Sequence, residues 1–245
     1  MWENVALKIA VLQKGFNYSQ DGPGNRLVLH LQGCNLHCPW CSNPESMAKA
    51  TAFENTEELL AFVLRSRPMM FDGGGVTFTG GEPTVQFDAL KELLTALKQN
   101  GVSTCIETNG TSARLPELFE WIDFLIMDFK HWNSDKLKAF TGVGNETVLA
   151  NLRAASVQRE QLLVRIPLIN GFNASADDAK GFVSCLQPLW HDGMKLEVLR
   201  YHEYGKDKWE KLGKPYQMQN AFVTDEQFDS FCSVLSSGSI ELTRT

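Results

Sequence analysis

The chain has 245 residues, of which 43% are hydrophobic and 21% are charged, ordinary values for a globular protein with a sizeable core. The formal net charge is -6, so no basic surface indicates nucleic-acid binding. No apolar run approaches membrane-spanning length, and the amino terminus lacks the basic region and small-residue cleavage site of a secretory signal. We therefore expect a cytoplasmic protein without nucleic-acid or membrane partners, in which cysteines stay reduced.

Strand-like and helical segments alternate about six times along the chain. Apolar runs predict strands at residues 26–31, 76–79, 102–108, 124–130, 162–167 and 196–199. Helical spacing and capping signals predict helices at residues 55–63, 87–97, 115–121, 146–155, 175–186 and 224–235. A Gly/Pro/Asn/Asp-rich stretch predicts a loop at residues 15–26. This alternation, with no linker between halves, predicts an α/β fold with a parallel sheet covered by helices.

Three cysteines lie in one short loop directly after the first predicted strand. Cys34, Cys38 and Cys41 have the spacing C-x3-C-x2-C. Three thiolates at this spacing can bind an iron–sulfur cluster that ordinarily takes four cysteine ligands. With no fourth cysteine nearby, one iron stays open, as in catalytic metal sites. Two alternatives remain: structural zinc with His37 or another residue as fourth ligand, and a disulfide that strands the third thiol.

The remaining cysteines are scattered along the chain. Cys105 lies in a predicted strand, whereas Cys185 and Cys232 lie in predicted helices. Because free cysteine is among the most frequently buried residue types, we expect each of them to be a small buried hydrophobic side chain.

Polar and glycine-rich residues recur where the predicted strands end. In addition to the cysteine loop, these residues are Gly81-Glu82, Thr108-Asn109, Asp128 with Lys130, and His202. In a (β/α) barrel these ends meet at one face, which carries the active site. Arg165 lies inside its strand and could point into the same cavity. This convergence predicts a functional site at the carboxyl ends of the strands.

With these residues in view, the chain resembles the radical S-adenosylmethionine (SAM) enzymes and, more narrowly, the glycyl radical enzyme activating enzymes. The cysteine motif and Gly80-Gly81-Glu82-Pro83 carry the broader resemblance. The narrower one rests on residues 21–26 (DGPGNR), 41–45 (CSNPE), 73–77 (GGGVT), 107–110 (ETNG), 128–130 (DFK) and 201–209 (YHEYGKDKW). The resemblance implies a single radical SAM domain over residues 1–245, a partial (β/α)6 barrel. Within it, residues 15–45 would form a partner-facing loop and the cluster-binding loop.

The resemblance implies an oxidoreductase that activates a glycyl radical enzyme. One 4Fe-4S cluster on Cys34, Cys38 and Cys41 would bind SAM and cleave it reductively. The resulting 5′-deoxyadenosyl radical would take a hydrogen atom from a backbone glycine of a partner, with a pyruvate formate-lyase-like enzyme as first candidate. Residues 42–72 contain no cysteine, whereas many activating enzymes carry a ferredoxin-like insertion there. We therefore expect a single cluster and an external electron donor, flavodoxin or ferredoxin.

The same resemblance implies a SAM-binding set of residues: Trp40, Gly80, Gly81, Glu82, Thr108, Asp128, Lys130, Arg165 and His202. Trp40 would lie by the adenine, although an aromatic anchor that packs the loop is an equal alternative. Gly80, Gly81 and Glu82 would present backbone polar groups to the methionine amino group, where glycine permits close approach. The charged members would line the ribose and carboxylate end, although each by itself could form a surface salt bridge.

Two further assignments follow from the resemblance. Glu107, Thr108 and Asp128 would form a monovalent-cation site for Na⁺ or K⁺, with Glu107 standing where an aspartate is expected. Asp21 and its Gly-Pro-Gly loop would help to place the partner's glycine loop, and a simple turn is the alternative. Lys206 and Lys208 could dock an acidic electron donor or could merely be solvated.

Two rival functions remain. The first is a radical SAM enzyme that acts on a small molecule, against which the Asp21 loop and the 201–209 block argue. The second is a non-enzymatic zinc or iron–sulfur module, which metal analysis and SAM binding would distinguish from an enzyme.

Overall fold

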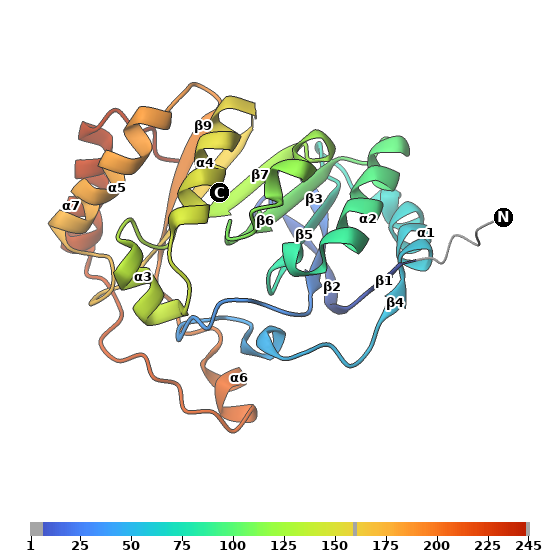
Figure 1. The fold of residues 1–245 in the computed structure, drawn as a ribbon, viewed down its shortest axis with the longest axis horizontal. Helices are drawn as coiled ribbons and strands as arrows, with labels where there is room; N and C mark the ends of the chain where they lie inside the picture. Colours follow the sequence, from blue (N-terminus) through green and yellow to red (C-terminus); the bar gives the residue numbers. More distant parts are fainter. Residues whose placement is uncertain (1–6, 159–160, 244–245) are drawn as a thin grey trace. The chain divides into compact units, whose positions relative to one another are not determined.

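The computed structural model describes residues 7–158 and 161–243 (Figure 1). Residues 1–6, on which part of the signal-peptide prediction rests, lie outside the described residues. The strands are β1 Lys8–Ile9, β2 Val11–Tyr18, β3 Asn25–Leu31, β4 Glu54–Asn55, β5 Val76–Gly80, β6 Thr104–Thr108, β7 Phe124–Asp128, β8 Leu162–Leu168 and β9 Met194–Arg200. The α-helices are α1 Thr56–Ser66, α2 Phe87–Gln99, α3 Ser134–Thr141, α4 Glu146–Gln158, α5 Ala176–Leu186, α6 Lys206–Lys211 and α7 Asp225–Ser237.

Short 3-10 helices join these elements. They are η1 Pro44–Met47, η2 Arg67–Met69, η3 Pro83–Gln86, η4 Leu115–Trp121 and η5 Gln187–Leu189. None of the helices in the described ranges combines the length and hydrophobicity needed to cross a bilayer.

The main sheet has seven strands in the order β2-β3-β5-β6-β7-β8-β9. β3 pairs in parallel with β5, and β5 pairs in parallel with β6. β8 and β9 form a second parallel pair, whereas β2 runs antiparallel to β3. β1 and β4 form a separate antiparallel pair. The predicted fold class, a parallel sheet with helices, is confirmed.

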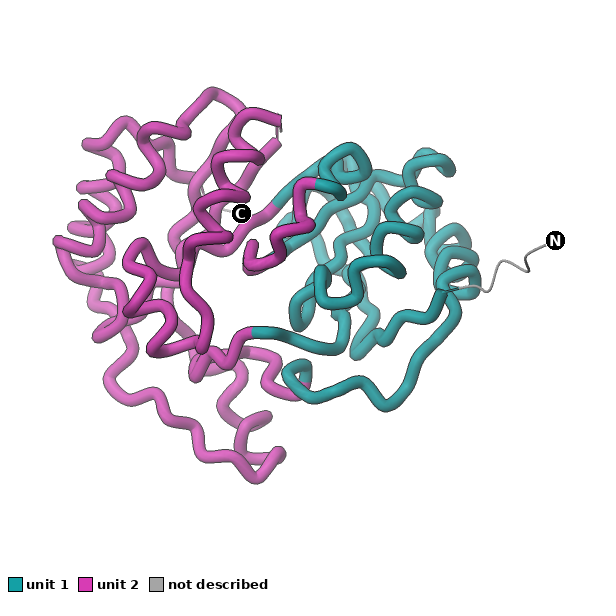
Figure 2. Tube along the Cα trace, in the orientation of Figure 1, with its two compact units in different colours: residues 1–35, 46–108, 117–125 teal, residues 36–45, 109–116, 126–245 magenta. Residues whose placement is uncertain are grey.

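The described chain divides into two compact units, drawn in different colours in Figure 2. Unit 1 comprises residues 1–35, 46–108 and 117–125, and unit 2 comprises residues 36–45, 109–116 and 126–245. The chain passes between the units several times, so each unit contains segments that are distant in sequence. A single domain over residues 1–245 stays a prediction.

Unit 1 is built around β3, whose side chains are buried on both faces, as is typical of a strand inside a parallel sheet. Helix α2 buries an apolar stripe that includes Leu90, Leu94 and Leu97, as its helical spacing predicts. The chain then turns at Gly101, whose φ is 67°. This glycine confirms the predicted end of the helix.

Unit 2 packs α5 and α7 side by side (Figure 1). Both helices begin with the predicted capping signals: Ser175 with Asp178, and Thr224 with Gln227, form complete capping boxes. The core between them is aromatic, because Phe182 meets Phe231 at a ring-centroid distance of 5.9 Å. Capping satisfies the amino-terminal N–H groups, while the burial of apolar faces holds the helices in place.

The sequence-based assignments need three corrections. The loop predicted at 15–26 is shorter, because β2 extends to Tyr18 and β3 begins at Asn25. The 115–121 segment is the 3-10 helix η4. Helices α3 and α6 and the strands β1, β2 and β4 were not predicted. β2 lacks a regular apolar alternation, and its pairing with β3 holds it in the sheet, a tertiary contact that local patterns do not reveal.

Arg26 is the largest fully buried side chain in the described core. Its guanidinium donates through Nε to the Thr77 hydroxyl at 2.7 Å and through Nη2 to the carbonyl oxygens of Val76 at 2.7 Å and Ser103 at 3.1 Å. Burial lowers the pKa of Arg26, and the charges of Asp123 and Asp21 partly offset this decrease. One cation thus joins the amino-terminal ends of β3, β5 and β6.

Replacing Arg26 should therefore destabilise the fold. We expect Arg26→Met to lower the free energy of unfolding by about 3 kcal/mol or more, since buried carbonyl and hydroxyl groups lose charged donors. Urea unfolding would measure this change. Arg65→Met, at an exposed position of α1, is the matched control and should change stability by less than about 0.5 kcal/mol. Equal effects of the two substitutions would contradict the role of Arg26.

Candidate functional site

In unit 1 the chain leaves β3 at Leu31 and turns at Gly33, whose φ of 99° is one that glycine adopts readily. Gly33 N donates to Ser46 O at 2.7 Å, and Gly33 O accepts from Glu82 N at 2.8 Å. These bonds fix the backbone directly before Cys34. The cysteine therefore lies at the carboxyl end of β3, as predicted.

The rest of the cysteine loop belongs to unit 2. Cys38 is buried and Cys41 is half-buried, and Cys41 N donates to Cys38 O at 3.1 Å. Asn43 N lies 3.4 Å from Cys41 Sγ and donates to it. Hydrogen bonds to cysteine sulfur are among the factors that tune iron–sulfur clusters. None of the six cysteines, all of which lie in the described residues, forms a disulfide. The structure therefore does not contain the disulfide considered above, and the donor set fits a cluster.

A single-ion site is not evident in the same residues. In the described part of the chain, no three His, Cys, Asp or Glu side chains group closely enough to hold one metal ion. His37, the alternative zinc ligand, is exposed and lies beside Gly142. Cysteines of a 4Fe-4S cluster each bind a different iron and need not converge on one ion. The assignment of Cys34, Cys38 and Cys41 as cluster ligands stays a prediction.

Gly80 is the last residue of β5, and Gly81 follows it at the same sheet edge. A Cβ on Gly80 would lie 2.5 Å from Leu31 N, and one on Gly81 would lie 2.0 Å from Gly33 O. The missing side chains therefore make room for the chain's own backbone at the end of β3. This close approach holds the two strand ends together, and contact of these glycines with SAM stays a prediction.

Glu82 is buried and caps the 3-10 helix η3. Its Oε1 accepts from Thr84 N at 3.0 Å and from the Thr84 hydroxyl at 2.5 Å, and the Thr108 hydroxyl donates to the same oxygen at 2.7 Å. Glu107 Oε2 accepts from the Thr79 hydroxyl at 2.9 Å. Unit 1 thus joins the predicted residues Glu82 and Thr108 directly, across the ends of β5 and β6.

In unit 2, Asp128 and Lys130 lie together at the end of β7. Lys130 Nζ donates to Asp128 Oδ2 at 2.5 Å, and both side chains are mostly buried. This ion pair holds the ammonium group near the strand end. The cation site would take Glu107 and Thr108 from unit 1 and Asp128 from unit 2, and it stays a prediction.

Arg165 and His202 also belong to unit 2. Arg165 Nε donates to Glu197 Oε2 at 2.8 Å, and these two buried residues are direct partners in the β8–β9 ladder. Glu197 was not predicted, although a carboxylate inside an apolar strand was a usable signal. The ring of His202 stacks on Tyr204 at a centroid distance of 4.0 Å, and burial lowers the pKa of His202. The neutral imidazole is thereby favoured.

Trp40 is 9% exposed. Its ring lies 4.6 Å from that of Phe172 and 6.2 Å from that of Phe140, measured between centroids. Aromatic packing of this kind anchors the cysteine loop to unit 2. The geometry supports the packing alternative for Trp40, and its contact with adenine stays a prediction.

Asp21 lies in the turn between β2 and β3. Its Oδ2 accepts from Asn17 Nδ2 at 2.5 Å, and its carbonyl oxygen accepts from the Thr77 hydroxyl at 2.6 Å. Cys34 follows the opposite end of β3, roughly 20 Å away at the rise of an extended strand. Asp21 is therefore at the sheet edge opposite Cys34, where it closes a turn. Its contact with a partner protein stays a prediction.

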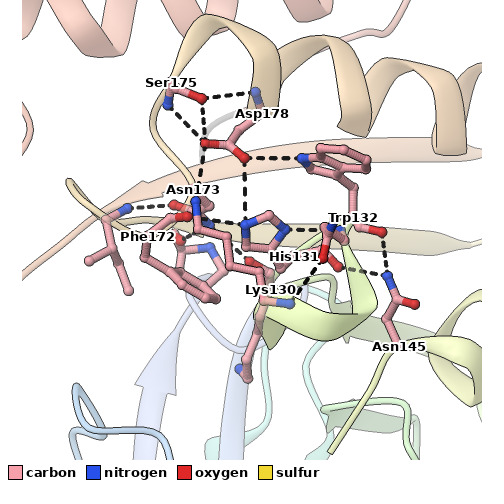
Figure 3. A network of polar contacts seen from close by, with 12 residues as sticks. Lys130, His131, Trp132, Asn145, Phe172, Asn173, Ser175 and Asp178 are labelled. Atoms are coloured by element: carbon pink, nitrogen blue, oxygen red, sulfur yellow. Dashed lines mark hydrogen bonds and ion pairs between the residues drawn. The ribbon is translucent and has the colours of Figure 1, made fainter. Parts of the chain in front are cut away.

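A buried polar network around His131 was missed by sequence reasoning (Figure 3). His131 Nδ1 accepts from Asn133 N at 3.0 Å, so the ring proton is on Nε2, which donates to Phe172 O at 3.0 Å. Asp178 Oδ1 lies 3.5 Å from Nε2 and accepts from Trp132 Nε1 at 3.1 Å. Burial is the main cause that lowers the pKa of His131.

Two asparagines extend this network to the end of β7. Asn173 Nδ2 donates to Lys130 O at 2.9 Å and to Pro167 O at 2.8 Å. Asn145 Nδ2 donates to His131 O at 3.0 Å (Figure 3). The backbone that follows the predicted residue Lys130 is thus fixed by side chains from distant segments. No local pattern marked them, because asparagine is common in loops.

Comparison with known proteins places this chain in a family. The model of the radical SAM superfamily matches residues 28–182, which include all three cysteines of the loop. The chain belongs to the radical SAM superfamily. A pyruvate formate-lyase-activating enzyme from Staphylococcus epidermidis (strain ATCC 12228 / FDA PCI 1200) is 34% identical over 218 residues, covering 84% of this chain and 86% of the relative. The corresponding enzyme from Staphylococcus aureus (strain USA300) is also 34% identical, over 219 residues.

Solved structures agree with this family. A domain of pyruvate-formate lyase-activating enzyme from Bacteroides vulgatus has a TM-score of 0.58 and 28% identity, covering 69% of this chain and 98% of that domain. A radical SAM methyltransferase from Sphaerobacter thermophilus has a TM-score of 0.66 over 93% of this chain and 67% of that one. At 16% identity, the methyltransferase supports the fold alone. Membership in the superfamily implies a 4Fe-4S cluster and SAM as cofactors.

The His131 network should make the stability of the fold pH-dependent. The unfolded chain protonates this histidine near pH 6.5, whereas the folded protein resists protonation because the ring is buried; Asp178 opposes this effect and Lys136 adds to it. The unfolded state thus binds more protons below about pH 6.5, and stability falls as the pH drops, by at most about 1.4 kcal/mol per pH unit.

Urea unfolding at pH 7.5 and pH 5.5 tests this prediction. Wild-type protein should lose more stability between the two pH values than His131→Gln, by roughly 1 kcal/mol. The comparison uses each protein as its own reference, so a constant destabilisation by the substitution cancels. An identical loss in the two proteins would show that His131 does not titrate differently on folding.

Proposed function

We propose that this protein is a glycyl radical enzyme activating enzyme. The observation that carries the proposal is its 34% identity with pyruvate formate-lyase-activating enzymes over 84% of the chain and 86% of the relative. The C-x3-C-x2-C loop and the 201–209 block support it. A pyruvate formate-lyase-like enzyme is the first candidate for the partner, because the relatives are named for that substrate.

Cys34, Cys38 and Cys41 would bind the cluster through three of its irons. When bound, the reduced cluster would supply the electron for cleavage of SAM, and the radical chemistry that this starts would remove a hydrogen atom from the partner's glycine. The chain's own residues prepare this site: Asn43 N–H is directed at Cys41 Sγ, and Cys38 and Trp40 are themselves buried away from water. Water exclusion matters because it prevents side reactions of a reactive intermediate.

The charged residues of unit 2 would orient SAM. The Asp128 contact holds the Lys130 ammonium, and Glu197 holds the Arg165 guanidinium. Fixed cations of this kind suit the carboxylate of the methionine part. His202, whose pKa is lowered by burial, would contribute a neutral ring beside the ribose. Trp40, Gly80, Gly81, Glu82 and Thr108 complete the proposed SAM-binding set.

Three finer assignments belong to the same proposal. Glu107, Thr108 and Asp128 would bind a monovalent cation, Asp21 would contact the partner, and flavodoxin or ferredoxin would supply the electron. Lys206 pairs with Glu203 at 3.0 Å and Lys208 pairs with Glu45 at 2.9 Å, so both lysines already have acidic partners within the chain. Their contact with an electron donor stays a prediction.

The cluster assignment predicts the behaviour of a cysteine variant. Anaerobically reconstituted wild-type protein should contain about four irons and four sulfides per chain, and reduction with dithionite in the presence of SAM should release 5′-deoxyadenosine. Cys38→Ala should lose the nucleoside product and most of the iron, because one of three protein ligands is missing. Iron, sulfide and product analysis would measure these quantities.

Cys185→Ala is the matched control, since this thiol lies in α5 outside the loop. It should retain wild-type iron content and product release. Zinc in place of iron, or a fully loaded cluster that never cleaves SAM, would refute the proposed enzyme. Electron paramagnetic resonance on candidate glycyl radical enzymes, mixed with SAM and the reduced protein, would then identify the partner by its glycyl radical.

A further inference from the structure

Residues 201–216, which we call the strap, follow β9 and contain α6 (Figure 1). Within unit 2, the strap contacts residues 41–45 of the cysteine loop. Trp209 Nε1 donates to Cys41 O at 3.0 Å. Lys208 Nζ donates to Asn43 Oδ1 at 2.7 Å and pairs with Glu45 Oε1 at 2.9 Å. A segment more than 160 positions away in sequence thus holds the end of the loop.

Gly205 leaves no space for a side chain between the strap and the cysteine loop. A Cβ at this position would lie 2.3 Å from Cys41 O and 2.8 Å from Ser42 Cα. The φ of Gly205 is -86°, which any residue can adopt. Glycine is therefore needed here for space, because the strap backbone lies directly against the cysteine loop.

A hydrogen bond also joins the two ends of the strap to each other. The hydroxyl groups of Tyr201 and Tyr216 lie 2.7 Å apart and share a hydrogen bond, which joins the beginning and the end of the segment. Burial and this contact raise the pKa of Tyr201. Tyr201 N donates to Leu168 O at 3.1 Å, which anchors the strap to the end of β8. The strap is thus held at both ends while it contacts Cys41.

Its contacts lead to the sulfur of one cysteine. Lys208 holds the side chain of Asn43, whose backbone N–H donates to Cys41 Sγ. Trp209 holds the carbonyl group of Cys41 itself. We propose that the strap positions Cys41 as a ligand of the iron–sulfur cluster, with Gly205, Lys208 and Trp209 as positioning residues. This proposal rests on the proposed function, because it takes Cys41 as a cluster ligand.

Thiol labelling tests the strap without the cluster. Reduced, cluster-free protein is treated with iodoacetamide, and fragment-ion mass spectrometry separates Cys41 from Cys34 and Cys38 on their shared peptide. Gly205→Ala and Lys208→Met should raise the labelling rate of Cys41 roughly fivefold to tenfold, since the labelling rate follows the population of the open loop. Labelling of Cys34 and Cys185 should stay unchanged.

Two matched controls share the chemistry of these substitutions. Lys206→Met removes the neighbouring lysine of α6, which pairs with Glu203. Gly15→Ala adds a Cβ that would have no heavy atom within 4 Å. Both should label like wild type. Lys208→Arg should restore slow labelling of Cys41, because it keeps a cationic donor at this position.

Reconstituted proteins give a second measurement. Gly205→Ala and Lys208→Met should lose iron to a chelator several times faster than wild type and the two controls. An unchanged labelling rate of Cys41, or an equal rise in the labelling rate of every cysteine in the Lys208→Met protein, would overturn the proposal that the strap positions Cys41. If Gly205→Ala does not fold, the Cys41 labelling rate of Lys208→Met decides the test. A wild-type protein that takes up no iron and sulfide would overturn the proposed function, whereas the labelling result does not depend on the cluster.

Discussion

The parallel pairing of β3 with β5 is the constraint on which the site in unit 1 depends. Its register places Leu31 opposite Gly80, so the two loops that follow leave the sheet side by side. Gly33 and Glu82 are then hydrogen-bonded at 2.8 Å, and Gly81 packs against Gly33 with no space for a side chain. Strand pairing thus fixes the backbone that leads to Cys34.

Polar side chains at the ends of the strands and within them are held by partners from neighbouring segments. Glu82 receives hydroxyl donors from Thr84 and Thr108, and Arg165 is paired with Glu197. In a largely dry interior, an unpaired charge would cost more than these bonds contribute. Such pairing also fixes the direction of each group before a ligand binds, which is what a preorganised site requires.

Unit 2 stabilises its part of the cysteine loop with residues that are far apart in the chain. Trp40 packs on Phe172, and Cys41 is contacted by Trp209 of the strap. Closing such long loops costs conformational entropy, which the buried aromatic core of the unit offsets. The geometry of the cysteine loop therefore depends on the folding of the carboxyl-terminal part of the chain.

Local sequence patterns were sufficient to predict the alternation of strands and helices, the helix caps at Ser175 and Thr224, and the cysteine motif, because periodicity, capping and ligand spacing are local properties. The remaining features depend on tertiary structure. It placed the irregular segment 11–18 in the sheet beside β3, put Asp21 at the edge opposite Cys34, and buried Trp40 among phenylalanines. It also determines the partners of site residues that were predicted from the sequence: Glu197 for Arg165, Asn173 for the backbone of Lys130, and Trp209 for Cys41. These choices could not be predicted from local patterns, because a side chain's partner depends on which distant segments the fold brings beside it.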